Sequence, residues 1–375
     1  MKKKLVSILM CTVMAASMIG GCGSGGQEGP AEAPAETEAP AAEEETPATG
    51  EETAAEVSEL NPEDDFDGGG KVIRVGLSWE ELQSSINQAW QDYFMTYSEE
   101  YGKAHNCSFD WIVTVADGDP AKEMSNIQDL INQEVDCIVA WANNGDTIGE
   151  SIKAAQAAGI PFVTFDHEST NVKPDAHVGE DSYTQAYTTA TEMVRILEEN
   201  GVTDAKAVVM QGTLTDSNAI ARGEAWKKVE EETGAWETVE WVPTDWEAEK
   251  FKSGLANVLA AHPEINLIYL ESDFAFNSVA AALEETDRLY PIGDEKHVYI
   301  AGDDVQPQGY QGQLDGYIDC GTTYDAWNQA VAVVEVVAKL SCGLKVPQVN
   351  YIQGRLATPD TVESLENLWS RDYND

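Results

Sequence analysis

The sequence predicts an α/β protein with two doubly wound lobes, each built on a parallel sheet. Three observations carry this prediction. Short strand patterns alternate with helical patterns from Lys71 onward, the strands are apolar without alternation, and the repeats form two series that separate near Gly179. Continuous apolar strands are typical of parallel sheets that helices cover on both faces. Residues 71–375 make roughly twice a typical domain length, which is enough for two cores.

The elements follow from these patterns in order. In the first series we expect strands at 72–77, 109–115, 135–141, 160–165 and 176–179, and helices at 83–103, 121–133, 146–158 and 183–199. In the second series we expect strands at 205–211, 237–242, 267–271, 297–302, 316–320 and 348–355, and helices at 218–233, 247–261, 274–286 and 325–342.

The region from Val135 to Phe165 shows the repeat most clearly. Two short strands, VDCIVAW and IPFVTF, are rich in β-branched and aromatic residues. The helix between them places Ile148, Ile152 and Ala155 at helical spacing, and Gly159 ends it. Both strands therefore belong to one parallel sheet.

Polar side chains follow these two strands. Trp141, Asn143 and Asn144 end the first strand, and Asp166 and His167 follow the second. Ligands of open α/β sheets bind beyond the carboxyl ends of the strands, so these residues are placed to line a crevice. Taken alone, an Asp beside a His is also compatible with catalysis.

The first 21 residues predict a processing signal. Lys2 to Lys4 form a basic region, an apolar run follows to Ile19, and the sequence IGGC ends at Cys22. This pattern resembles the lipobox of bacterial lipoproteins, which implies cleavage before Cys22 and lipidation of its thiol. The resemblance predicts an extracytoplasmic protein that is lipid-anchored to the cell membrane; the alternative is an uncleaved signal anchor, for which the apolar run is short.

Residues 22–70 predict a disordered acidic tether of Ala, Pro and Glu. From Gly23 to Gly70 the chain has 15 acidic residues and no Lys or Arg, so it cannot bury enough apolar surface to fold. The formal net charge of the whole chain is −45, of which −33 falls on residues 71–375. This charge argues against nucleic acid as a partner.

No motif for catalysis or metal binding is present in the sequence. It contains no GxSxG, no HExxH and no Walker glycine loop, and its five His residues form no metal-spaced pair. The sequence therefore predicts no enzyme, no cofactor and no metal. Cys107, Cys137, Cys320 and Cys342 show no CxxC spacing, so free thiols are expected, with one disulfide left open.

Several segments between residues 71 and 356 resemble the type I periplasmic binding proteins for sugars, in the pattern of the ribose binders. They are DPAKEMSNIQDLINQEVD, GIPFVTFDHE, ARGEAW, TDW, ESD and AGDD, and they occur in the family's order. The resemblance implies two lobes joined by three hinge crossings, near 179–181, 320–323 and 346–350. The N-terminal lobe is then 71–180 with 322–348, and the C-terminal lobe is 181–321 with 349–375.

The resemblance also implies a set of sugar-contacting residues. The family's acidic residue after the fourth strand falls on Asp166, and its Arg before Gly-Glu falls on Arg222. Its ring-stacking aromatic resembles Trp246, and its acids after the eighth and ninth strands fall on Asp273 and Asp304. Aromatic side chains can stack on the C–H faces of a pyranose ring, while carboxylate and guanidinium groups can hydrogen-bond to its hydroxyls.

Five places depart from the family pattern, one of which is the hinge Gln, replaced by another residue in the segment 320–323. His167 stands where the family has Arg, Trp141 where the ribose binders have Asn, and Ser272 where they have Asn. The end of the first strand departs most, and its candidates are Trp79, Glu81 and Gln83.

The resemblance implies a monomeric binder of a neutral monosaccharide that delivers its ligand to the membrane permease of an ABC transporter. Alternatives remain open at this stage. The same fold serves sensors that feed a chemoreceptor or a histidine kinase. The changed positions also leave room for a polyol or autoinducer-2, and the excess of carboxylates would suit an amino sugar or another cationic compound.

Overall fold

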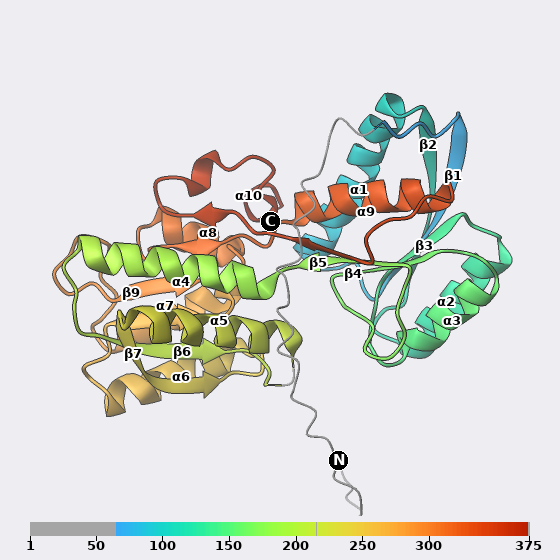
Figure 1. The fold of residues 1–375 in the computed structure, drawn as a ribbon. Coiled ribbons are helices and arrows are strands. Elements are labelled where there is room, and N and C mark those ends of the chain that lie inside the picture. Colours follow the sequence, from blue (N-terminus) through green and yellow to red (C-terminus); the bar gives the residue numbers. More distant parts are fainter. Residues whose placement is uncertain (1–64, 215, 374–375) are drawn as a thin grey trace, which may run out of the picture. The chain divides into compact units, whose positions relative to one another are not determined.

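The computed structural model describes residues 65–214 and 216–373 (Figure 1). The predicted signal peptide, Cys22 and the tether up to residue 64 lie outside the described residues. The described part is an α/β structure with two parallel sheets, which confirms the predicted fold class.

The first sheet has six parallel strands in the order β11-β5-β4-β3-β1-β2. Their bounds are β1 Lys71–Trp79, β2 Cys107–Val115, β3 Cys137–Trp141, β4 Phe162–Phe165, β5 Ala176–Glu180 and β11 Val349–Ile352. β2 lies on one side of β1, and β3 and the strands that follow it lie on the other side. The strand order therefore reverses between β1 and β3. Parallel sheets of this kind bind ligands beyond the carboxyl ends of the strands at such a point.

Helices cover both faces of this sheet. α1 (Ser85–Ala104) and α9 (Ala326–Ser341) lie side by side on one face, and α2 (Pro120–Asn132) and α3 (Ile148–Ala157) pack together on the other (Figure 1). α1 begins at Ser84, whose hydroxyl accepts a hydrogen bond from the backbone N–H of Asn87. α9 is apolar along most of its length because it is buried in the larger of the two cores of this lobe.

The second sheet has four parallel strands in the order β7-β6-β8-β9. Its elements are β6 Ala205–Gln211, β7 Trp236–Pro243, β8 Leu267–Leu270, β9 Tyr299–Gly302, and the helices α4 Ser182–Glu199, α5 Ser217–Thr233, α6 Ala248–Ala261 and α7 Phe276–Glu285. α4 and α5 cover one face and α6 and α7 the other. On the α5 side, the Trp226 ring stacks on Tyr269 at 4.2 Å and on Trp236 at 4.3 Å between centroids. The order reverses here between β6 and β8.

Three crossings join the lobes. The chain leaves the first sheet after β5, returns through β10 (Gly321–Thr322), and leaves again after β11. β10 pairs antiparallel with β12 (Leu356–Ala357). Because β11 pairs with β5 as far as Ile352, the last crossing falls after that residue, a few residues later than the sequence boundary at 348.

Other differences from the expected elements lie near the C-terminus. The expected strand at 316–320 is reduced to one bridge between Ala301 and Cys320, since Gly316 adopts a positive φ of 73° and turns the chain. The sequence did not predict five elements, which are α8 Pro307–Leu314, the short strands β10 and β12, η2 Val362–Ser364 and α10 Trp369–Asp372, and the helix expected at 274–286 begins with the short helix η1 Asp273–Ala275. α8 escapes detection because its sequence, PQGYQGQL, is short and mostly polar or glycine.

Within the described residues, Cys107, Cys137, Cys320 and Cys342 are free thiols. Among the helices of this part of the chain, none is both long and apolar enough to cross a membrane.

Two buried acids stand at the carboxyl edge of the second sheet and influence how its loops pack. Glu271 follows β8, is fully buried, and accepts a hydrogen bond from the backbone N–H of Gly212 at 2.8 Å. Burial raises the pKa of Glu271 to about 8. Asp303 follows β9 and accepts from the hydroxyls of Thr189 and Tyr269, and burial raises its pKa to about 7.

These raised pKa values predict that stability falls as the pH rises. An acid whose pKa is raised by folding stabilises the folded state below its unfolded pKa and loses that contribution as pH rises through the folded value. We therefore expect the Tm to decrease between about pH 5 and pH 8, and Glu271→Gln to flatten this slope. Thermal unfolding followed by circular dichroism at several pH values measures the slope of Tm against pH. Each kcal/mol of unfolding free energy corresponds to about 2–4 °C in Tm.

Glu240→Gln provides the matched control. Glu240 is exposed on β7, so its replacement removes the same charge without relieving burial. If both variants changed the slope equally, general charge repulsion rather than the buried carboxyl of Glu271 would explain the pH dependence.

Candidate functional site

A cleft of about 420 Å³ lies where the carboxyl ends of both sheets meet. This volume is within the range of small-molecule sites, about 300–1,000 Å³. Residues from the ends of six strands line it, together with the start of α1 and the second crossing. They are Glu81, Ser84, Ile86, Asn87, Trp90, Trp141, Asp166, Asp216, Asn218, Arg222, Trp246, Ser272, Phe274, Asp304, Gln306 and Tyr324.

Asp166 is the first residue after β4, and two neutral donors fix its carboxylate. The hydroxyl of Tyr324 donates to Oδ1, and the indole Nε1 of Trp141 donates to Oδ2 at 2.5 Å. Each carboxylate oxygen has a second lone pair, so Asp166 can still accept from a ligand. The sequence predicted Asp166 and Trp141 at this edge, and the structure brings both to the cleft.

Arg222 lies on α5, and its side chain is only 4% exposed. Its guanidinium donates to Gln185 Oε1, to the Glu271 carbonyl at 2.7 Å and to Asp304 Oδ1 at 2.6 Å. Burial lowers the pKa of Arg222, but the nearby carboxylates of Asp304 and Asp303 outweigh this effect, so the net pKa is raised. Arg222 therefore carries a buried positive charge that pairs directly with Asp304.

Trp246 follows β7 and lies against the loop after β6. Its Nε1 donates to Asp216 Oδ2 at 2.8 Å, and a Cβ added at Gly212 would overlap its indole ring. Gly212 is therefore required for the ring to reach the cleft. Asp216 also caps α5 through the backbone N–H of Asn218.

Three cleft residues, and the fully buried Val305 next to one of them, have an uncommon backbone conformation. The φ angles of Asp166, Trp246, Asp304 and Val305 are 59°, 58°, 86° and 49°. Such left-handed conformations cost on the order of 1–3 kcal/mol each for non-glycine residues and persist where the surroundings impose them. Their concentration at the ends of three different strands indicates that the side-chain directions at this edge serve a function.

Two predicted residues lie behind the cleft wall. Trp79 is fully buried and packs edge-on against Phe165 at 5.4 Å between centroids. Asp273 is also fully buried; its Oδ1 accepts from the Gln306 backbone N–H at 2.8 Å, and burial raises its pKa well above the usual range. The residue before it, Ser272, lines the cleft instead.

His167 faces an adjoining cavity of about 530 Å³. Its ring stacks on Trp141 at 5.0 Å between centroids, and its Nδ1 lies 2.7 Å from the Ala142 carbonyl oxygen. Its side chain is 44% exposed. This cavity shares Asp166, Asp216 and Asn218 with the cleft, so His167 lies next to the cleft rather than in its wall.

Sequence reasoning missed several cleft residues. Tyr324 stands in the second crossing, where no strand pattern marks a ligand contact. Asn87 and Trp90 share one face of α1 at i, i+3 spacing, and Asp216 is the N-cap of α5. The cap position and the helical spacing were visible signals, but neither distinguishes a cleft residue from an ordinary structural one.

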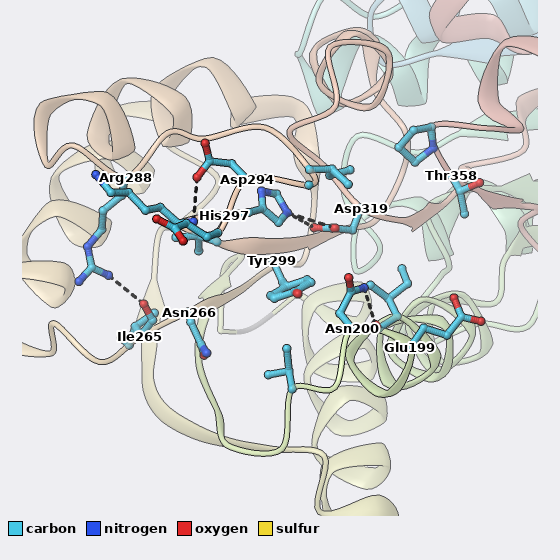
Figure 2. A pocket seen from close by; sticks show the side chains of 18 of the residues that line it. Glu199, Asn200, Ile265, Asn266, Arg288, Asp294, His297, Tyr299, Asp319 and Thr358 are labelled. Atoms are coloured by element: carbon cyan, nitrogen blue, oxygen red, sulfur yellow. Dashed lines mark hydrogen bonds and ion pairs between the residues drawn. The ribbon is translucent and has the colours of Figure 1, made fainter.

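A larger cavity of about 970 Å³ lies at the amino ends of the second sheet's strands (Figure 2). Several of its polar side chains bond to protein groups. His297 Nε2 faces both oxygens of Asp319 at 3.1 Å, and Arg288 donates to the Ile265 carbonyl (Figure 2). His297 Nδ1 faces the Tyr290 carbonyl oxygen. Five Trp, Phe and Tyr rings line the cleft, whereas among the described residues Tyr299 alone supplies such a ring to this cavity, so the cleft is the better candidate for ligand binding.

Comparison with known proteins agrees with this geometry. The ribose import binding protein RbsB of Salmonella typhimurium is 23% identical over 244 residues, covering 65% of this chain and 78% of the relative. A periplasmic ribose ABC transporter structure from Conexibacter woesei has a TM-score of 0.69 at 20% identity, covering 80% of this chain and 96% of that chain.

An ABC transporter solute binding protein from Bacillus halodurans, solved with bound myo-inositol, has a TM-score of 0.64 at 22% identity, covering 79% of this chain and 98% of that chain. At these identities the structural likenesses show the fold. The model of the periplasmic binding protein domain family matches residues 75–345, which is most of the folded part. The chain therefore belongs to the periplasmic binding protein domain family.

Proposed function

We propose that this chain is an extracytoplasmic solute-binding protein that captures a monosaccharide or a related polyol between its lobes and delivers it to the permease of an ABC transporter. The observation that carries the proposal is the cleft itself. Aromatic rings and hydrogen-bonding carboxylates converge there from the carboxyl ends of both sheets, at the points where the strand orders reverse. The ribose-binding and inositol-bound relatives support this class of ligand.

The site residues that we propose are Asp166, Arg222, Trp246, Asp304 and Trp141. Asp166 and Asp304 accept from ligand hydroxyls, Trp246 and Trp141 supply apolar surface for the ring, and Arg222 positions Asp304. Asp273 and Trp79 support the wall from behind, and His167 borders it. A ligand lacking one hydroxyl would leave a buried polar group unpaired, at a cost of about 1–3 kcal/mol.

The polar groups of the cleft suit ligand binding without a chemical reaction. The cleft acids are held by neutral donors or by Arg222, and none of the described His, Cys, Asp and Glu residues form a group that could hold a metal ion. We further propose that the protein acts as a monomer, anchored to the membrane by lipid on Cys22. The sensory alternative uses the same cleft and differs only in the partner, a chemoreceptor or histidine kinase instead of a permease.

The first prediction of this proposal concerns ligand class. In a thermal-shift screen over sugars, polyols, nucleosides, amino acids and polyamines, we expect stabilisation by sugars or polyols. A ligand at a hundred times its Kd adds about 2.7 kcal/mol, which corresponds to an increase in Tm of about 5–10 °C. Stabilisation by amino acids or polyamines alone would sink the proposal.

The second prediction concerns Asp166. Asp166→Ala removes an acceptor from the cleft wall and leaves the donors of Trp141 and Tyr324 without their carboxylate. We expect the ligand-dependent shift to disappear while circular dichroism shows a folded protein. Asp129→Ala, at an exposed position on α2, serves as the control and should keep the shift. A shift retained by Asp166→Ala would place the ligand elsewhere.

A further inference from the structure

The guanidinium in the cleft wall has no donor left for a ligand. Arg222 has five N–H groups, and five hydrogen bonds run from them to protein acceptors. Two go to Gln185 Oε1, one to the Glu271 carbonyl and two to Asp304, of which the Nη1 to Oδ2 bond is long at 3.5 Å. The sequence suggested that Arg222 donates to ligand oxygens, and this hydrogen-bond arrangement gives it a different role.

Three neutral donors of the wall are also directed at protein carboxylates, whereas the Trp90 indole N–H has no protein partner. Trp141 and Tyr324 donate to the two oxygens of Asp166, and Trp246 donates to Asp216. Both carboxylates keep lone pairs on each oxygen after these bonds. The cleft therefore presents an excess of acceptors to a ligand.

Negative charges also outnumber positive charges in the cleft. Four carboxylates, Glu81, Asp166, Asp216 and Asp304, stand against the single guanidinium of Arg222, which gives a formal charge of −3. Among the described residues that line the cleft and the adjoining cavity, Arg222 is the only Lys or Arg. On the side of that cavity, His167 Nε2 lies 3.5 Å from Asp166 Oδ2 and supplies one positive charge when protonated.

Asp166 and Asp216 face the same space from different lobes. Both line the cleft and the adjoining cavity. The bonds that Asp216 accepts come from two neutral groups, the Trp246 indole and the Asn218 backbone N–H. Two carboxylates on opposite walls repel each other, and a cation between them removes this repulsion. Five aromatic rings also line the cleft, and cations bind favourably to aromatic faces.

We infer that the ligand is a polyhydroxylated ring that carries a protonated amine, such as an amino sugar or an aminated cyclitol, with its ammonium group between Asp166 and Asp216. This inference rests on the proposed function and narrows its ligand class. The ligand's hydroxyls donate to the remaining carboxylate lone pairs. Its ammonium group offsets part of the negative charge that the single guanidinium of Arg222 does not neutralise.

Isothermal titration calorimetry on the purified full-length chain tests this. The probes are D-glucosamine, D-galactosamine, D-mannosamine and an aminated inositol, each compared with its neutral parent and its N-acetyl derivative at a pH at which the amine is protonated. We expect at least one amine to bind tenfold or more tighter than both of its neutral counterparts. High salt should reduce this advantage.

Asp216→Asn should lower the affinity for the amine at least tenfold more than that for its neutral parent, because the loss of the Trp246 hydrogen bond affects both ligands and the loss of charge affects the amine alone. Asn also caps helices well, so the start of α5 is retained. Asp245→Asn is the matched control, because Asp245 pairs with Lys250 and does not line the cleft. Binding of neutral parents as tightly as amines, or an equal loss for both, overturns the inference and leaves the proposed function standing. Binding of none of these compounds overturns the inference as well, and the thermal-shift screen over sugars and polyols then decides whether the proposed function stands.

Discussion

The buried guanidinium of Arg222 is the constraint on which the rest of the site depends. A charge in the protein interior must be paired and fully hydrogen-bonded, because an unpaired one costs several kcal/mol. Arg222 meets this requirement through Asp304, the Glu271 carbonyl and Gln185. Gln185 Nε2 in turn donates to the carbonyls of Thr322 and Thr323. One network thus fixes the ends of β8 and β9, the start of α4 and the second crossing.

This network continues to the other lobe through Tyr324. The backbone N–H of Tyr324 donates to the Asp304 carbonyl, and its hydroxyl donates to Asp166. The Trp369 indole donates to the Tyr324 carbonyl at 3.1 Å and holds the crossing in place. Asp166 and Asp304 both have positive φ, so strained backbone and shared hydrogen-bond partners set the directions of these two cleft carboxylates. The same residues therefore line the cleft and connect the two lobes.

The sequence predicted the fold better than the details of the site, for physical reasons. Strand and helix periodicity reports burial along each element, and it placed Asp166 and Trp141 at the carboxyl edge of the first sheet, whereas Arg222 was identified through the family resemblance. It does not report which residue at a strand end faces the cleft. Trp79 and Trp141 are register partners on neighbouring strands, yet the helix packed over β1 buries one and leaves the other in the wall. Tertiary packing also buries Asp273 behind the cleft wall and leaves Ser272 to line the cleft, the reverse of the expectation. It also places Tyr324 of the second crossing against Asp166.

We propose that the ligand occupies the cleft between the carboxyl edges of the two sheets. A crystal structure of the protein with a stabilising ligand bound tests this. We expect ligand polar atoms within about 3.2 Å of the carboxylates of Asp166 and Asp304, with Arg222 still bonded to Gln185 and Glu271. A ligand found in the cavity beside His297, or bound directly by the Arg222 guanidinium after loss of its protein partners, would contradict it.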